Sequence, residues 1–190
     1  WGFLPAVNDA KWSLKGNTLG YINVPGSWNN IWKLPGLEAA GRGPAWKGLD
    51  LKALSRAWYV RDVKIPASWQ GRRVVLTLDR VSTDSTVYCN DVECGVVNWP
   101  YGNVDVTKAV KFGKINHLRL LVVATESAKA TVNAMGVGAG QLTKSKAKLE
   151  GKGLIGDVIL ESMPRTPVVT DVFVKTSTRK NEMEVDVELE

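Results

Sequence analysis

The sequence predicts an all-β fold, a β-sandwich, and three stretches carry this prediction. Between residues 73 and 81 apolar side chains recur at every second position, the period of a strand with one face in a core. Residues 86–97 form two such runs joined by Asn90-Asp91, which tolerate the positive φ of a tight turn and so predict a β-hairpin. Residues 118–123 are rich in Leu and Val and contain no Gly or Pro, as in a strand near the middle of a sheet.

The first third of the chain is less regular. Residues 1–19 have little periodicity, and we expect them to lie across the sandwich. Residues 21–24 predict a short strand, which a Pro-Gly pair ends. Residues 27–55 carry Trp28, Trp32 and Trp46 among Pro and Gly and predict a long ordered loop packed by its own aromatics, with at most one helical turn near residues 49–54. A strand at residues 58–65 follows, and a proline ends it.

Length and charge narrow the function classes. A chain of 190 residues can bury an independent core without disulfide staples. The net charge of +6 comes from basic residues that are scattered among predicted strands and loops, which argues against nucleic-acid binding. No apolar run approaches the ~20 residues of a membrane span. No signal peptide is recognised either, so we expect a soluble chain in mature or trimmed form.

Two cysteines lie on opposite arms of the predicted hairpin. A two-residue turn places Cys89 opposite Val92 and leaves Cys94 one diagonal away. This geometry favours buried free thiols over a disulfide, but both alternatives stay open.

Six short motifs follow one another along most of the chain. They are VPGSW at 24–28, IPASWQGRRV at 65–74, VYCND at 87–91, VDVT at 104–107, NHL at 116–118 and GLIGDVIL at 153–160. In this order they resemble the N-terminal sugar-binding-like domain of glycoside hydrolase family 2, which includes β-galactosidases, β-glucuronidases and β-mannosidases. The resemblance implies a jelly-roll β-sandwich, galactose-binding-domain-like, over residues 1–163. It also suggests a periplasmic or secreted protein.

The character of the chain changes after residue 162. Pro164 and Pro167 punctuate a short linker, residues 169–175 predict a strand, and residues 183–189 alternate apolar and acidic side chains. Two strands cannot make a stable sandwich alone, so we interpret residues 164–190 as a linker and the truncated start of an immunoglobulin-like domain. In the resembled family such a domain follows the jelly roll, and a catalytic (β/α)8 barrel follows in turn.

A loop with two aromatic residues is the candidate carbohydrate-binding site. It comprises Asn98, Trp99, Tyr101 and Asn103 on a segment rich in Pro and Gly. Sugar rings present flat C–H faces that stack on aromatic planes, and asparagines can bind their hydroxyl groups. The alternative is that Trp99 and Tyr101 only close the edge of the sandwich.

Residues 127–152 are rich in Ala, Gly and Lys and predict a long loop with one strand at residues 130–135. Its lysines are Lys144, Lys146, Lys148 and Lys152. They could hold an acidic sugar, but a solvated loop is the favoured interpretation. The glycines at residues 136–140 lack the strand, helix and Lys-Ser/Thr ending of a phosphate loop. Residues 153–160 then predict the closing strand.

We predict no catalytic residue in this chain. Glycoside hydrolysis needs two carboxyl groups across one bond, which in the resembled family are barrel glutamates, the acid/base one preceded by Asn. Asn181-Glu182 is the only such dipeptide, and it falls in a turn.

His117 lacks a second His, a Cys or an acidic cluster, so neither a zinc site nor a nucleophile–base pair is predicted. A structural calcium would need a dense acidic loop, which the sequence lacks; no cofactor is predicted.

Two positions depart from the family pattern. Gly156 stands where an Arg usually precedes Asp-Val, and Asn90-Asp91 stands for the usual Asn-Gly turn.

The resemblance implies a non-catalytic domain that supports a barrel hydrolysing β-linked sugars and lends a loop to its cleft. Its partners would be carbohydrate and the missing domains of the parent chain. The alternatives are a free-standing carbohydrate-binding module and a structural or adhesion sandwich.

Overall fold

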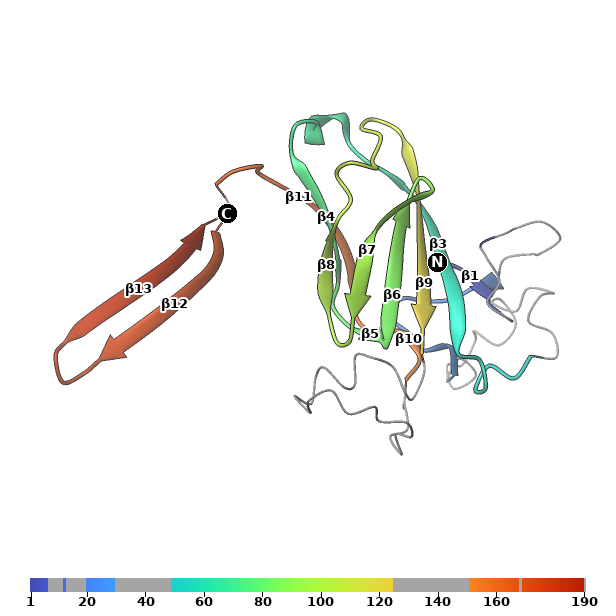
Figure 1. Ribbon diagram of the computed structural model, residues 1–190, viewed down its shortest axis with the longest axis horizontal. Helices are drawn as coiled ribbons and strands as arrows, with labels where there is room; N and C mark the ends of the chain where they lie inside the picture. The colour runs from blue at the N-terminus through green and yellow to red at the C-terminus, as the bar shows by residue number, and fades with distance from the viewer. Residues whose placement is uncertain (7–11, 13–19, 30–48, 125–150, 168, 190) are drawn as a thin grey trace.

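A computed structural model of the chain describes residues 1–6, 12, 20–29, 49–124, 151–167 and 169–189. In these residues the secondary structure is almost entirely β, with a short 3₁₀ turn at Ala67–Trp69 between two strands and a 3₁₀ conformation also at residues 28–29. Figure 1 shows two sheets packed face to face, with a separate hairpin beyond them. The all-β sandwich prediction is confirmed. The described part contains no helix that is long and apolar enough to cross a bilayer.

Within the described residues the larger sheet has six antiparallel strands in the order β2-β1-β3-β9-β6-β7. The bounds are β1 Gly2–Pro5, β2 Gly20–Tyr21, β3 Arg56–Lys64, β6 Asp84–Cys89, β7 Val92–Asn98 and β9 Ile115–Val123. The predicted central strand is confirmed, because β9 lies between β3 and β6. The strand expected at residues 21–24 is shorter and ends at Tyr21.

The prediction for the N-terminus was wrong in one respect. Residues 2–5 do not simply lie across the sandwich; they form a strand, β1, beside β3 with Leu4 opposite Trp58. Phe3 is fully buried in the core, and strand pairing satisfies its backbone groups there. Trp12 does lie over the outer face of this sheet, where its ring is 5.7 Å from that of Trp58.

The smaller sheet, as far as the chain is described, has three strands in the order β11-β4-β8. Their bounds are β4 Arg73–Leu78, β8 Gly102–Asp105 and β11 Val158–Met163. A two-stranded ribbon, β5 Val81–Ser82 with β10 Gly153–Leu154, continues from it. The predicted strands at 73–81 and 153–160 are therefore each interrupted. The interruption has a backbone cause, because the amides of Ile155 and Gly156 both donate to the carbonyl of Arg80 at 3.0 Å.

The core lies between the two sheets. Phe3, Trp28 and Tyr59 form an aromatic group at its centre, with ring centroids 5.2 to 6.3 Å apart. All three side chains are fully buried. Aliphatic residues from both sheets surround them, including Leu76, Leu78, Val87, Leu118, Leu120 and Leu154. Sequence alternation in these strands thus separates core from surface as expected.

The predicted hairpin of β6 and β7 is confirmed. Asn90 and Asp91 have φ of 48° and 68°, so both turn residues are left-handed, as a type I′ turn requires. Cys89 lies opposite Val92, and a bulge follows because Tyr88 pairs with Glu93 and Val87 with Gly95. Cys94 falls in this bulge, and both cysteines are free thiols in the structure.

The C-terminal hairpin consists of β12 Val169–Ser177 and β13 Glu182–Leu189, which pair with each other. Figure 1 shows it apart from the sandwich. Val172 faces Val187 and Val174 faces Val185 across the pair, and each of the four is about half exposed.

The boundary after residue 163 and the immunoglobulin-like continuation stay predictions. The predictions for Trp32, Trp46, the strand at 130–135, the glycines at 136–140, Lys144, Lys146 and Lys148 lie outside the described residues.

Candidate functional site

The candidate carbohydrate loop crosses from one sheet to the other. β7 ends at Asn98 and β8 begins at Gly102, so the loop joins the two layers at the edge of the sandwich. The carbonyl of Pro100 accepts a hydrogen bond of 2.9 Å from the amide of Val81, which fixes the loop to β5. Trp99 is 43% exposed and Tyr101 71% exposed. Both rings are therefore accessible to a ligand.

The two asparagines of the site face opposite sides of the molecule. Asn98 is exposed and follows buried Val97 on β7, so it lies on the outer face of the larger sheet. Asn103 is exposed and precedes buried Val104 on β8, so it lies on the outer face of the smaller sheet. Asn98 and Asn103 therefore do not share a face, and sugar binding by this loop stays a prediction. The structure keeps together Tyr101 and Asn103, which are two positions apart at the start of β8.

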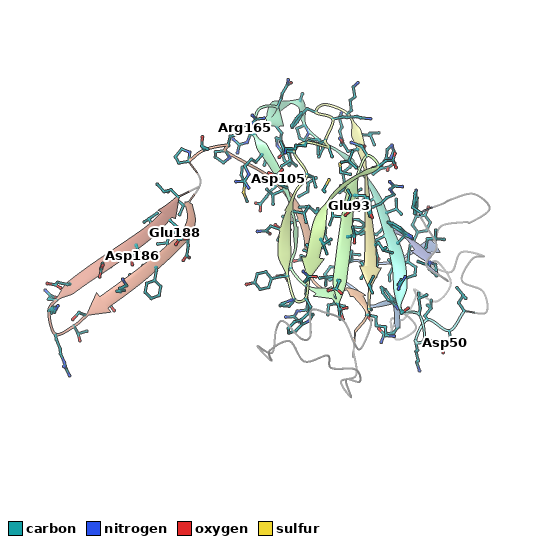
Figure 2. The ribbon with its side chains drawn as sticks, in the orientation of Figure 1. Asp50, Glu93, Asp105, Arg165, Asp186 and Glu188 are labelled. Atoms are coloured by element: carbon teal, nitrogen blue, oxygen red, sulfur yellow. The ribbon has the colours of Figure 1, made fainter. Side chains whose placement is uncertain are left out.

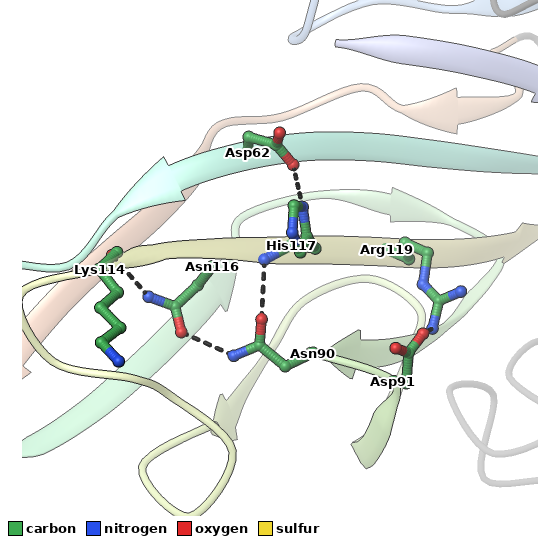
Figure 3. A network of polar contacts seen from close by, with 7 residues as sticks. All are labelled: Asp62, Asn90, Asp91, Lys114, Asn116, His117 and Arg119. Carbon is green, nitrogen blue, oxygen red and sulfur yellow. Dashed lines mark hydrogen bonds and ion pairs between the residues drawn. The ribbon is translucent and has the colours of Figure 1, made fainter.

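A polar network joins the hairpin turn to the start of β9 (Figure 3). Asn116 is fully buried, and its Oδ1 accepts hydrogen bonds from Asn90 Nδ2 at 2.7 Å and the Lys111 amide at 2.6 Å. Its Nδ2 donates to the carbonyls of Lys111 and Lys114 at 2.9 and 3.0 Å. All of its hydrogen-bonding capacity is used, so this asparagine of the NHL motif has a structural role.

His117 lies on the exposed side of the same network. Its Nδ1 is 2.5 Å from Asp62 Oδ1, and both side chains are about 60% exposed. Its amide donates to Asn90 Oδ1 at 3.1 Å. This is an ordinary surface contact at the beginning of a strand, as predicted. Among the described residues no group of three or more His, Cys, Asp or Glu is arranged to hold a metal ion.

Sequence reasoning missed Arg119, a nearly buried cation on the outer face of the larger sheet. Its guanidinium contacts the Asp91 carboxylate and lies 5.2 Å from the ring centroid of Trp12 and 6.0 Å from that of Tyr88. The only signal in the sequence was a charge between Leu118 and Leu120. Since the aromatic partners are distant in sequence, that signal could not name them.

Asp105 is also engaged in structure. Its Oδ1 accepts from the Thr107 amide at 2.8 Å, and its Oδ2 is 3.3 Å from Arg73 Nε. Burial alone would raise the pKa of Asp105, but the hydrogen bonds of Thr107 and the charge of Arg73 outweigh it and lower the pKa below its usual value. This ionised carboxylate ties β8 to β4. A lowered pKa makes this carboxyl group unsuited to act as a general acid near neutral pH.

Lys152 is the one predicted loop lysine within the described residues. Its ammonium donates to the carbonyls of Lys52 and Leu54 at 2.7 and 3.3 Å. There the backbone makes one turn, within the limit of at most one helical turn predicted for residues 49–54, with the Leu54 amide bonded to the Asp50 carbonyl at 3.2 Å. The lysine therefore caps a turn and is not free to hold an acidic sugar.

No protein-family model and no curated protein matches the sequence. Solved structures do match. The β-glucuronidase of Faecalibacterium prausnitzii superposes with a TM-score of 0.69 and 19% identity, over 100% of this chain and 34% of that one. The chain has the fold of a segment of family 2 glycoside hydrolases. A Ruminococcus gnavus β-glucuronidase gives a TM-score of 0.67 at 15% identity, over 100% of this chain and 31% of that one.

The resemblance to the family 2 fold is thus confirmed beyond the β-glucuronidases. A family 2 member from Bacteroides cellulosilyticus matches with a TM-score of 0.58 and 18% identity, over 92% of this chain and 22% of that one. The chain spans about a third or less of the length of these proteins. The shared fold therefore corresponds to one part of a larger polypeptide in them.

Proposed function

We propose that the chain is the non-catalytic N-terminal domain of a family 2-like glycoside hydrolase that hydrolyses β-linked sugars. One observation carries this proposal: the match covers the whole of this chain and about a third of each of several β-glucuronidases. The domain supports a catalytic barrel supplied by the rest of the parent protein. Its loop at Trp99 and Tyr101 extends toward the substrate cleft.

The roles of the motif residues support this proposal. Asn116 and Asn90 saturate a buried network, and Gly156 lies against the backbone of Arg80. Each of these positions holds the sandwich together and none presents a reactive group. Structural roles for these three motif residues fit a supporting domain whose reactive groups belong to another part of the protein.

The first test is hydrolysis by the 190-residue chain. We expect no release of 4-nitrophenol from 4-nitrophenyl β-glucuronide, β-galactoside or β-mannoside above the rate in buffer, because the reacting carboxyl groups belong to another domain. Turnover that scales with the concentration of the purified chain would overturn the proposal.

A free-standing carbohydrate-binding module is the second candidate, and the exposure of Trp99 and Tyr101 favours it. It requires measurable oligosaccharide binding that is lost in Trp99→Ala. Tyr21→Ala is the matched control, because Tyr21 is a 65% exposed aromatic on β2. Calorimetric titration of the chain with neutral β-linked oligosaccharides decides: binding lost only in Trp99→Ala supports the module, and no binding supports the supporting domain.

A further inference from the structure

A cavity of about 600 Å³ lies where the β7–β8 edge of the sandwich meets the linker. Its walls come from β4, the bulge of β7, the end of β8 and the turn after it, and the linker at residues 164–167. Figure 2 labels Arg165 of the linker and Asp105 of β8 near one another at this junction. The lining residues are Arg73, Cys94, Asp105, Thr107, Lys108, Arg165 and Thr166.

The cavity carries an excess of positive charge. Of its three cations, Arg73 is paired with Asp105, the one carboxylate in the lining. Lys108 and Arg165 have no ion pair or hydrogen bond within the described part of the chain. Burial raises the pKa of Cys94, so its thiol is neutral and does not offset them. Two positive charges therefore face the cavity without a compensating anion.

Hydrogen bonds hold both walls in place. On the sandwich side Thr107 Oγ1 accepts from the Val74 amide at 2.8 Å, one residue before Lys108. On the linker side Arg72 donates to the carbonyl and the hydroxyl of Ser162, each at 3.0 Å, at the end of β11. Arg165 follows three residues later. The two unpaired cations thus extend from anchored backbone, which reduces the entropic cost of binding.

Size and chemistry define the ligand. The volume lies in the range of organic ligand sites, about 300–1,000 Å³, and is far larger than an inorganic anion needs. Lys108 and Arg165 are suited to carboxylates, and Arg can bind one in a bidentate way. The long stems of the basic side chains supply apolar wall. We propose that this cavity binds an acidic oligosaccharide through two carboxylates, one on Lys108 and one on Arg165.

The anion site follows from charge and geometry, whereas the choice of a saccharide rests on the function proposed above. The probe is β-1,4-linked diglucuronate, titrated calorimetrically into the 190-residue chain at low salt. Cellobiose serves as its neutral counterpart and succinate as the dicarboxylate that is not a sugar. We expect diglucuronate to bind, cellobiose not to bind, and the diglucuronate affinity to fall as NaCl screens the charges.

Variants locate the site. We expect K108Q/R165Q to weaken diglucuronate binding by about tenfold or more, since two charge-assisted contacts are lost. R179Q/K180Q removes the same two charges from the exposed turn of the C-terminal hairpin, and we expect its affinity to match the wild type. All four side chains are exposed, so both variants should keep the far-ultraviolet circular dichroism of the parent chain.

The opposite results would overturn the inference. An equal loss of affinity in both double variants would show that binding depends only on overall charge. Succinate binding as tightly as diglucuronate would show that the site does not recognise a saccharide. No diglucuronate binding at all would show that the cavity is not a binding site. In that last case β-glycoside hydrolysis by the complete parent protein would still support the proposed function, so the two failures are distinguishable.

Discussion

Some glycines of this sandwich are required because neighbouring atoms leave no space for a side chain. Gly153 has φ of +125°, and a Cβ there would lie 2.3 Å from the hydroxyl oxygen of Tyr59 and 3.1 Å from the Trp28 ring. Tyr59 and Trp28 are fully buried and cannot move aside. The glycine at the start of the closing GLIGDVIL motif is therefore required by packing and by backbone conformation.

We predict that Gly153→Ala lowers the free energy of unfolding by about 3 kcal/mol, from the clash and the positive φ together. Urea unfolding followed by tryptophan fluorescence measures it. Tyr59→Phe removes the clashing oxygen, so Gly153→Ala should cost less in a Tyr59→Phe background. A cost that is the same in both backgrounds would show that the hydroxyl group is not the obstacle.

The packing around Gly156 explains why this chain has glycine where the family pattern has arginine. A Cβ at this position would lie 2.5 Å from the amide nitrogen and 2.7 Å from the Cβ of Arg80. An arginine could enter only if the two backbone segments separated, which would break the hydrogen bonds that Arg80 O accepts. In this chain the position serves the turn between β10 and β11.

Asp105 gives a pH dependence whose sign is fixed. Its pKa is lowered in the folded state, so the ionised carboxylate stabilises the fold above the ordinary value of 3.8. That contribution is lost as the pH falls through the lowered folded pKa. Asp105→Asn should therefore destabilise the chain near about pH 7 by up to ~1 kcal/mol, and the difference from wild type should shrink in acid.

The measurement for Asp105 is urea unfolding of both proteins from about pH 7 down to about pH 2.5. A difference that stays constant over that range would mean that the carboxylate acts through its shape and not its charge.

At the scale of elements, buried polar contacts fix how strands and turns are joined. Asn116 makes four hydrogen bonds at the point where the hairpin turn, the segment at residues 109–114 and β9 meet. We predict that Asn116→Ala costs about 3 kcal/mol of unfolding free energy, because it leaves buried partners unsatisfied. Asn103→Ala, on an exposed face of β8, is the control and should change stability by less than ~0.5 kcal/mol.

Chemical denaturation with both asparagine variants tests this network. Equal effects at the two positions would contradict a special role for the buried one. Amide hydrogen exchange adds a local measurement, since Asn116→Ala should deprotect the Lys111 amide first.

Sequence patterns that act over a few neighbouring residues predicted several strands and one turn correctly. Alternation and an Asn-Asp turn located β6, β7 and β9, because a two-residue period and left-handed turn residues act over short distances. The strand character of residues 2–5 was missed because it depends on pairing with β3, more than fifty residues away. The break at residues 155–157 depends on the distant carbonyl of Arg80 in the same way.

The arrangement of the candidate site also depends on contacts that short sequence patterns do not reveal. The sequence places Asn98 and Asn103 on one loop, but strand alternation in two different sheets turns them to opposite faces. The cavity that joins Lys108 to Arg165 unites residues 57 positions apart, and no motif marks it. Such sites become visible only when the strands are placed side by side.

At the scale of the whole molecule, the sandwich and the C-terminal hairpin differ in what stabilises them. The sandwich has a continuous core, whereas the described side chains of β12 and β13 are exposed on both faces, except for partly buried Ser177. An isolated two-stranded hairpin is only marginally stable in water. The hairpin should therefore contribute little to the stability of the sandwich.

We predict that removing residues 164–190 leaves the melting temperature of the sandwich within about 2 °C of the full chain. Differential scanning calorimetry of the two proteins checks this, and the transition should stay cooperative. A fall of about 10 °C or more would show that the hairpin is part of the first sandwich and would argue against a domain boundary at residue 163.

The central claim is that this chain supports catalysis that happens elsewhere in its parent protein. The most direct measurement compares hydrolysis of 4-nitrophenyl β-glycosides by three proteins: the complete product of the gene, that product without residues 1–190, and the chain alone. The account predicts turnover by the complete product, and none by the chain or by the product that lacks it. Activity in the isolated chain, or undiminished activity when these residues are removed, would contradict it.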